Sequence, residues 1–188
     1  MKYLAIALSF IPLAFASWPA PAGPWTASAR HIPSDAGKII EDSLQASGGH
    51  FWMGKSATPY CPSDVANLDC SLYNGTDTVL IGGNNTIFLD VTVPGGQQMY
   101  IASDGALSYS VPHSLPPAGA ITTGFWREGS EGFMGAVFFG HEGSSAYACP
   151  VEDEEDVYQI FLGTEFTGCY GVLLFTYTFS GATVWEYS

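Results

Sequence analysis

The stretch VPGGQQMYIASDGALSYSVPH, residues 93–113, contains the clearest hairpin signal of the chain. Its segments QQMYIAS and ALSYSV meet at Asp104-Gly105, a dipeptide that favours the tight turn of a β-hairpin. At the start of the stretch, Gly95-Gly96 predict a second turn, because glycine adopts positive φ without steric cost. The stretch therefore indicates antiparallel strands, and its glycines and glutamines need no ligand to explain them.

The same alternation of apolar and polar residues continues on both sides. In TIFLDVTV, residues 86–93, every second residue from Ile87 to Val93 is aliphatic, and in LLFTYTF, residues 173–179, Leu173, Phe175 and Tyr177 alternate in the same way. A period of two places one face of each strand against a core. The Gly- and Asn-rich residues 82–85 predict a hairpin turn between DTVLIGG and TIFLDVTV. Further strand segments are HFWMG, FMGAVFFG, SAYAC, VYQIFLG, YGVLLFTYTF and TVWEY. About ten short strands predict an all-β fold, an antiparallel β-sandwich or barrel.

The beginning of the chain has a different composition. Residues 1–16 combine a positive start, an apolar centre and an Ala-Phe-Ala end, which predicts a secretory signal peptide too short to span a membrane. Residues 17–47 are rich in Pro, Ala and Ser and predict an N-terminal arm without a sheet period. Within the arm, SDAGKIIEDSLQAS, residues 34–47, is the candidate for one short helix. Residues 48–188 are expected to form a single β domain.

The charge balance of the chain restricts its partners and its compartment. Without residues 1–16 it has four basic and eighteen acidic residues, a formal charge of -14, which disfavours nucleic acid and membrane partners. Charged residues make up 12%, about half the ~25% of an ordinary soluble domain, so uncharged polar groups must cover the surface. Two sequons, at Asn74 and Asn84, predict N-glycosylation of a secreted protein.

Four cysteines predict two disulfides in an oxidising compartment, with three connectivities open. The local pairing Cys61–Cys70 and Cys149–Cys169 is favoured, because each bond closes a short loop. Each bond is expected to contribute about 2–3 kcal/mol. The spacing contains no C-x-x-C pair, so zinc is not expected.

A set of motifs occurs in a characteristic order: LQASGGHFWMG…YCP, VPGGQQMYIASDGALSYSVPHS, PPAG, ACP…VYQIF and a final Cys169. Over roughly residues 44–170 they resemble the fungal PhiA-like family of secreted cell-wall proteins, also described as IgE-binding proteins. The resemblance implies a small secreted glycoprotein linked to the fungal wall and to the development of spore-bearing cells. Some members are allergens, and relatives in plant pathogens act as elicitors. The resemblance brings no catalytic residues. The chain departs from the family pattern at Lys55, where a second glycine is expected, and in its longer N-terminal arm.

No complete catalytic set is found in the sequence. His141-Glu142 begins like a zincin motif, but Ser145 stands where the second histidine belongs, and Glu128 replaces the glycine of a nucleophile elbow around Ser130. Serine catalysis would need one of the four histidines beside a carboxylate, which sequence leaves open. We therefore expect a non-enzyme without metal or cofactor. Glycoside hydrolysis needs two carboxylates held across a groove, and it is the second alternative to a non-catalytic role, after sugar binding. The candidate catalytic carboxylates are Asp90, Asp104, Glu128, Glu131, Glu142 and Glu165.

Two remaining features bear on binding. The acidic run of residues 152–156 favours a solvated loop over a cation site, because ligands at alternate positions with a glycine turn are missing. Most aromatic residues of a small β domain belong to its core, but Trp126, expected in a loop, and Gln98, beside the glycine turn, are candidates for sugar contacts.

Together with this resemblance, the sequence predicts a secreted, wall-associated glycoprotein of a fungus with a structural or interaction role. Recognition by hosts as elicitor or allergen is what the resemblance implies. Its expected partners are wall polysaccharide or a host receptor or antibody. The first alternative is a lectin-like module that binds wall polysaccharide.

Overall fold

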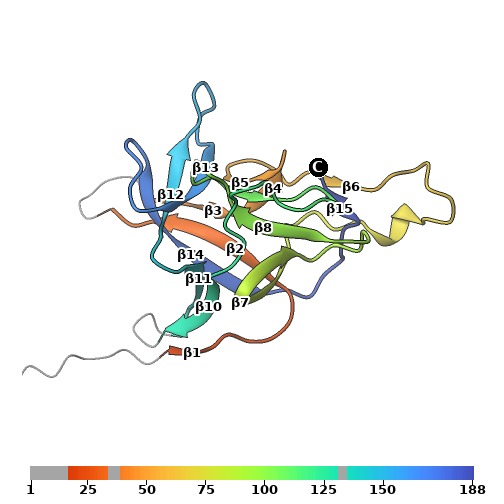
Figure 1. The fold of residues 1–188 in the computed structure, drawn as a ribbon, viewed down its shortest axis with the longest axis horizontal. Helices are drawn as coiled ribbons and strands as arrows, with labels where there is room; N and C mark the ends of the chain where they lie inside the picture. Colours follow the sequence, from red (N-terminus) through yellow and green to blue (C-terminus); the bar gives the residue numbers. More distant parts are fainter. Residues whose placement is uncertain (1–16, 34–38, 131–134) are drawn as a thin grey trace, which may run out of the picture.

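The computed structural model describes residues 17–33, 39–130 and 135–188 (Figure 1). The predicted signal peptide, residues 1–16, lies outside the described residues. The strands are β1 (Ser17–Pro19), β2 (Trp25–His31), β3 (Ile40–Ser43), β4 (Gln45–Ser47), β5 (His50–Met53), β6 (Pro59–Tyr60), β7 (Leu80–Leu89), β8 (Gln97–Ile101), β9 (Leu107–Tyr109), β10 (Phe125–Ser130), β11 (Val137–His141), β12 (Ser145–Pro150), β13 (Tyr158–Gly163), β14 (Tyr170–Thr178) and β15 (Glu186–Tyr187). The helical part of the described residues is one 3-10 turn, Cys70–Leu72. The predicted all-β antiparallel class is confirmed.

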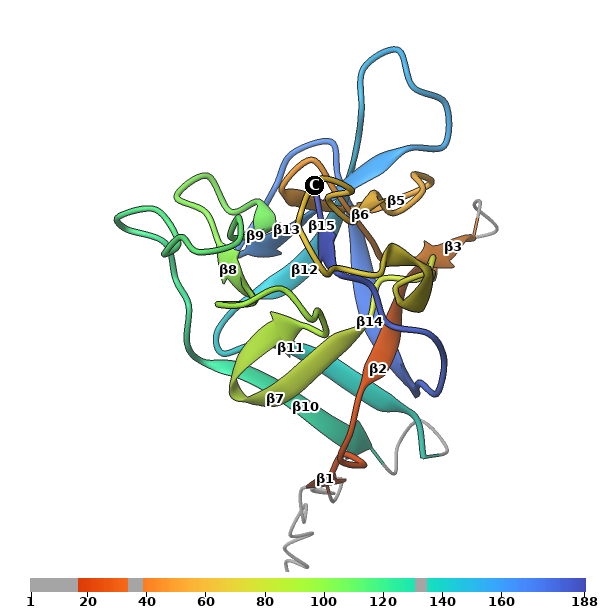
Figure 2. The same cartoon turned by 90° about the vertical axis from the view of Figure 1, so that its right-hand side faces the viewer.

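Nine of these strands close into a barrel. Following the pairings, the ring runs β7, β10, β11, β14, β12, β13, β5, β9, β8 and back to β7. Outside the ring, β2 pairs with β14 and continues to β3, and β1 pairs with β10 (Figure 2). Strand β4 pairs with β5. A closed ring leaves its strands with partners on both sides. Of the two architectures that the sequence left open, the structure is the barrel.

The two predicted hairpins are present. Strands β8 and β9 pair through Met99↔Tyr109 and Ile101↔Leu107, and the Asp104 carboxylate accepts a hydrogen bond from the Ala106 N–H in the turn. Strand β7 folds back on itself: the Asp90 N–H donates to the Val79 carbonyl at 2.8 Å. Gly82, at φ +95°, lies so close to the Thr86 carbonyl that a side chain would not fit.

The N-terminal part differs from the prediction. Residues 25–31 form β2, whose Trp25 and Ala29 are fully buried, and residues 40–47 contain β3 and β4 where a helix was expected. The predictions of an arm without sheet structure and of a helix are wrong for these residues; residues 34–38 lie outside the described part. The reason is tertiary: β14 offers β2 a long partner, and β2 in turn pairs with β3. The small residues that alternate along β2 can pack against the core once β14 provides a strand partner.

The face of β14 that points inward is also the reverse of the predicted one. Val172, Leu174 and Thr176 are buried, whereas Leu173 and Tyr177 are 39% and 50% exposed. Paired residues of antiparallel strands share a face, and Leu174 and Thr176 lie opposite Ala29 and Ala27 of β2, which are buried. By the same register, Leu173, Phe175 and Tyr177 point outward.

The fully buried Gln97 joins the barrel to the C-terminal strand. Its side-chain amide donates to the carbonyls of Ser110 at 3.2 Å and Tyr187 at 2.9 Å, and its Oε1 accepts from the Tyr187 N–H at 2.8 Å. The Tyr187 hydroxyl donates to the Asp77 carbonyl, and burial raises the pKa of this phenol. Gln97 is therefore a structural residue.

Two disulfides staple the loops around this barrel. Cys61 is bonded to Cys70, between β6 and the 3-10 turn, and Cys149 on β12 is bonded to Cys169, next to β14. The structure confirms the local pairing favoured from loop length.

Candidate functional site

The most notable surface feature is an apolar outer face on β10, β11 and β14. Glu128 pairs with Phe138, and Phe138 pairs with Phe175, so these side chains lie on one side of the sheet. The rings of Phe138 and Phe175 lie 4.6 Å apart between centroids. Two positions from Glu128 along β10, Trp126 is on the same side, paired with Gly140. We call the side chains of Trp126, Phe138, Leu173, Phe175 and Tyr177 the outer aromatic face.

Gly140 lets the Trp126 indole lie against β11. A Cβ at this position would come within 2.6 Å of the indole ring, so the ring lies directly over the glycine backbone. The prediction of a loop around Trp126 is wrong, because the residue is the second of strand β10 and has strand partners on both sides. The strand places one face of the indole against the sheet and leaves the side chain half-exposed.

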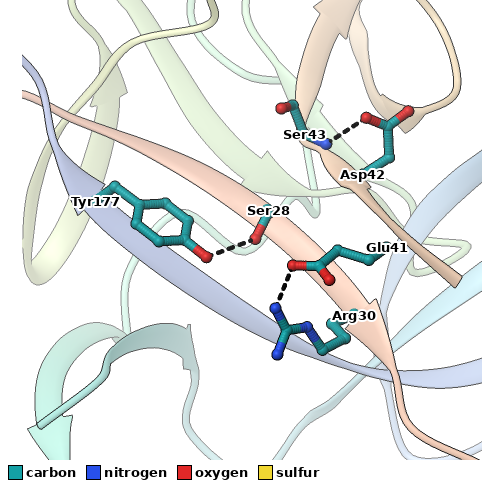
Figure 3. A network of polar contacts seen from close by, with 6 residues as sticks. All are labelled: Ser28, Arg30, Glu41, Asp42, Ser43 and Tyr177. Atoms are coloured by element: carbon teal, nitrogen blue, oxygen red, sulfur yellow. Dashed lines mark hydrogen bonds and ion pairs between the residues drawn. The ribbon is translucent and has the colours of Figure 1, made fainter. Parts of the chain in front are cut away.

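The outer aromatic face has a polar border on β2 and β3 (Figure 3). Arg30 on β2 forms an ion pair with Glu41 on β3, and its guanidinium lies 5.0 Å from the centre of the Phe175 ring. The Tyr177 hydroxyl and Ser28 Oγ are hydrogen-bonded at 3.3 Å. Arg30 is thereby neutralised locally, and the border fixes the orientation of Tyr177.

A pocket of about 410 Å³ opens in this face where β11 and β12 diverge. Strand β14 pairs with β12 at Val172 but with β11 at Phe175, so its neighbour changes between these two residues. The floor reaches the core at Phe139, Leu162, Val172 and Leu174. Trp126, Glu128, Ser145 and Leu173 also line the pocket. A second hollow, of about 660 Å³, is more polar and lies under residues 18–23 next to Arg127.

The two predicted sugar-contact residues are in different places. Trp126 lines the 410 Å³ pocket, whereas Gln98 is on β8 and its amide lies 3.5 Å from the Thr122 carbonyl. The sequence did not predict Phe175 and Leu173 as surface residues, and the Phe138 side chain next to them is 8% exposed and therefore nearly buried. The signal was available in YGVLLFTYT, where both faces of the strand are apolar and one of them must remain outside.

Within the described residues, two serine–histidine contacts occur, and neither has triad geometry. His141 Nδ1 lies 3.1 Å from Ser144 Oγ, but its Nε2 lies 3.0 Å from the Thr123 carbonyl, where a triad needs a carboxylate. His50 Nδ1 lies 2.9 Å from the hydroxyl of Ser108, which is completely buried and out of reach of a substrate. Both imidazoles serve as structural hydrogen-bond partners.

The candidate carboxylates for glycoside hydrolysis are spread over the fold. Glu128 lines the pocket, Asp104 caps its hairpin turn, and Glu142 and Glu165 are exposed in turns. Asp90 follows β7, and burial raises its pKa. Glu131 lies outside the described residues. Among the residues that line the pocket in the described chain, Glu128 is the one carboxylate, whereas glycoside hydrolysis needs a pair.

The acidic residues 152–156 form an exposed loop between β12 and β13. Glu154 forms an ion pair of 3.3 Å with Lys55, whose ammonium lies 4.1 Å from the Trp52 ring. Within the described ranges, no cluster of three potential metal ligands occurs. The sequon residues Asn74 and Asn84 are both exposed, as glycosylation requires, and their occupancy stays a prediction.

Comparisons with known proteins agree with the resemblance seen in the motifs. The family model of the PhiA-like secreted proteins matches residues 31–188. A protein of Arthroderma benhamiae named "Uncharacterized secreted protein" is 39% identical over 120 residues, which are 63% of this chain and 58% of the relative, so the match spans less than two thirds of that protein. No solved structure matches. In the described part of the chain, no helix is long and apolar enough to cross a membrane. The protein is secreted, and the chain belongs to the PhiA-like secreted protein family.

Proposed function

We propose that this protein is a wall-associated, non-catalytic binding protein that attaches to wall polysaccharide through the outer aromatic face. The observation that carries this proposal is that Trp126 on β10 and Phe175 on β14, both partly exposed, lie on the same side of the sheet, with the nearly buried Phe138 of β11 packed against Phe175. The proposal combines the predicted wall association with the predicted lectin-like alternative, because binding of wall polysaccharide by the outer aromatic face would also attach the protein to the wall.

The chemistry of this face suits a sugar chain. The C–H groups of a pyranose ring carry small positive charges and lie favourably on the negative face of an aromatic ring. The glycine under Trp126 holds the indole against the sheet. Wall glucans and chitin are uncharged, so the net charge of the acidic chain does not repel them.

Sedimentation with insoluble chitin, β-glucan and fungal wall tests the proposal. The secreted protein should sediment in a saturable way without releasing soluble sugar. Trp126→Ala should weaken binding about tenfold, from the loss of about 1–2 kcal/mol of stacking. Trp52→Ala is the matched control, since Trp52 is also half-buried but lies on β5, on the opposite side of the ring of strands.

Two outcomes would contradict the proposal. Equal sedimentation of both variants would show that the outer aromatic face does not bind the polysaccharide. Release of soluble sugar, abolished by one carboxylate substitution, would favour the glycoside hydrolase alternative. Recognition by a host as elicitor or allergen, and a role in spore development, stay predictions that rest on the family resemblance; leaf infiltration with the folded protein tests the first.

A further inference from the structure

The 410 Å³ pocket beside Trp126 has the size and lining of a small-molecule site. Sites for small molecules have volumes of about 300–1,000 Å³ and are lined mainly by apolar side chains with a few polar groups. Here Phe138, Phe139, Leu162 and Leu174 supply the apolar lining. A sugar would leave its hydroxyl groups without partners on such a floor, whereas an aliphatic or aromatic body would not. The apolar floor of the pocket therefore favours a different ligand from the outer aromatic face around it.

The charges around the pocket select the polar end of the ligand. Glu128 is the one charged group that lines the pocket in the described chain. The nearby guanidinium groups are engaged elsewhere. Arg127 is buried and donates to Thr176 Oγ1 at 3.0 Å and to the Pro21 carbonyl at 2.6 Å, while Arg30 is paired with Glu41. A carboxylate on the ligand would meet a negative charge without a compensating cation.

We propose that this pocket binds one small molecule with an aliphatic or aromatic body and a neutral or cationic polar end. The body lies on Phe139, Leu162 and Leu174, and the polar end points to the mouth at Glu128 and Ser145. This activity is separate from polysaccharide attachment, because the sugar lies on the outer face and the apolar body enters the floor. The binding energy comes mainly from apolar area removed from water.

Fluorescence of N-phenyl-1-naphthylamine, a neutral apolar probe, measures binding to the intact secreted protein. Decan-1-ol, decylamine and decanoate then compete for the site, the alcohol below its solubility limit and the two charged compounds below their micelle concentrations. We expect one probe per chain, displacement by decan-1-ol and decylamine, and roughly tenfold weaker displacement by decanoate because of Glu128. Octan-1-ol should compete roughly tenfold less well than decan-1-ol, since it buries two methylenes fewer.

Four variants locate the site. Ser145→Trp covers the mouth from an exposed position and should weaken binding at least tenfold, while Glu142→Trp, on the neighbouring turn and outside the pocket lining, should not. Glu128→Gln should bring decylamine and decanoate to similar affinity. Leu173→Arg, at a residue 39% exposed, should reverse the preference in favour of decanoate and serves if Ser145→Trp does not fold.

The proposal is overturned if the folded protein shows no saturable probe binding, if the two tryptophan variants bind equally, or if decanoate competes as well as decylamine. Displacement by a soluble β-glucan oligosaccharide but not by decan-1-ol would also overturn it. The sedimentation assay is independent of these results. If the protein binds the probe but does not sediment with polysaccharide, only the proposed function is contradicted. If it sediments with polysaccharide but does not bind the probe, only the small-molecule site is contradicted.

Discussion

Replacing Gln97 by methionine should destabilise the protein strongly, although the two side chains have similar size and shape. The substitution removes three hydrogen bonds to backbone groups: the Ser110 carbonyl, the Tyr187 carbonyl and the Tyr187 N–H. Gln97 is fully buried, so water cannot replace the lost partners. Each bond is worth about 1 kcal/mol net, and a buried group left without a partner costs about 1–3 kcal/mol. We expect a loss of about 3–5 kcal/mol.

Urea unfolding of the oxidised protein measures this loss. With a urea dependence of about 2 kcal/mol per M, the midpoint should fall by about 1.5–2.5 M. A loss of this size is a large fraction of the total stability of a domain, about 5–15 kcal/mol. Hydrogen exchange should show the greatest loss of protection at Tyr187, because the C-terminal strand loses its connection to β8.

The adjacent Gln98 supplies the matched control. Its side chain is half-exposed, and its amide makes one contact of 3.5 Å with the Thr122 carbonyl. Gln98→Met should therefore change stability by no more than about 0.5 kcal/mol. If the two variants shift the urea midpoint equally, or if Gln97→Met shifts stability by less than about 1 kcal/mol, the assignment of Gln97 as a structural connection is refuted.

The remaining predictions concern β14 and Asp90. Leu174→Ala should lower the free energy of unfolding by about 2–5 kcal/mol, because Leu174 is 2% exposed. Leu173→Ala, at a residue 39% exposed, should lower it by less than about 1 kcal/mol. The opposite order in urea unfolding would mean that the other face of β14 is buried. Burial raises the pKa of Asp90 in the folded protein above the ordinary value of about 3.9. The folded protein therefore binds a proton at Asp90 more tightly than the unfolded chain does. Stability is lost as the pH rises from about 3.9 through the raised pKa. Asp90→Asn should therefore stabilise the protein at pH 7, and this gain in stability should disappear below pH ~3.9. If urea unfolding shows the same gain at pH 7 and below pH ~3.9, titration of Asp90 is not the cause of the gain.

Local chemistry explains why much of the fold was readable in the sequence. The turn at Asp104-Gly105 and the folded shape of β7 depend on residues that accept tight turns, such as Gly82 at φ +95°. The two disulfides each join cysteines close in sequence, 9 and 20 residues apart. In TIFLDVTV, one face is apolar and the other mixed, so the period of two also predicts the buried side: Ile87 and Leu89 are buried.

The candidate site could not be predicted from local sequence, because its geometry depends on contacts between residues that are far apart in the sequence. Both faces of β14 are apolar, and its inward side is set by pairing with β2, which brings Ala29 opposite Leu174. The same pairing turns residues 25–31 into a strand, although their composition predicted an arm. Trp126 became part of this surface, and Gln98 did not, because the ring places β10 next to β11, which in turn pairs with β14, whereas Gln98 is on β8.

The sequence by itself determined the class of the fold, the main hairpins and the disulfide pairs, since these follow from backbone preferences and short chain separations. The tertiary structure alone decided which face of β14 is exposed, and with it the outer aromatic face and the pocket. The physical reason is that alternation defines two faces of a strand, but only the partner strand and the closure of the barrel decide which of them is buried.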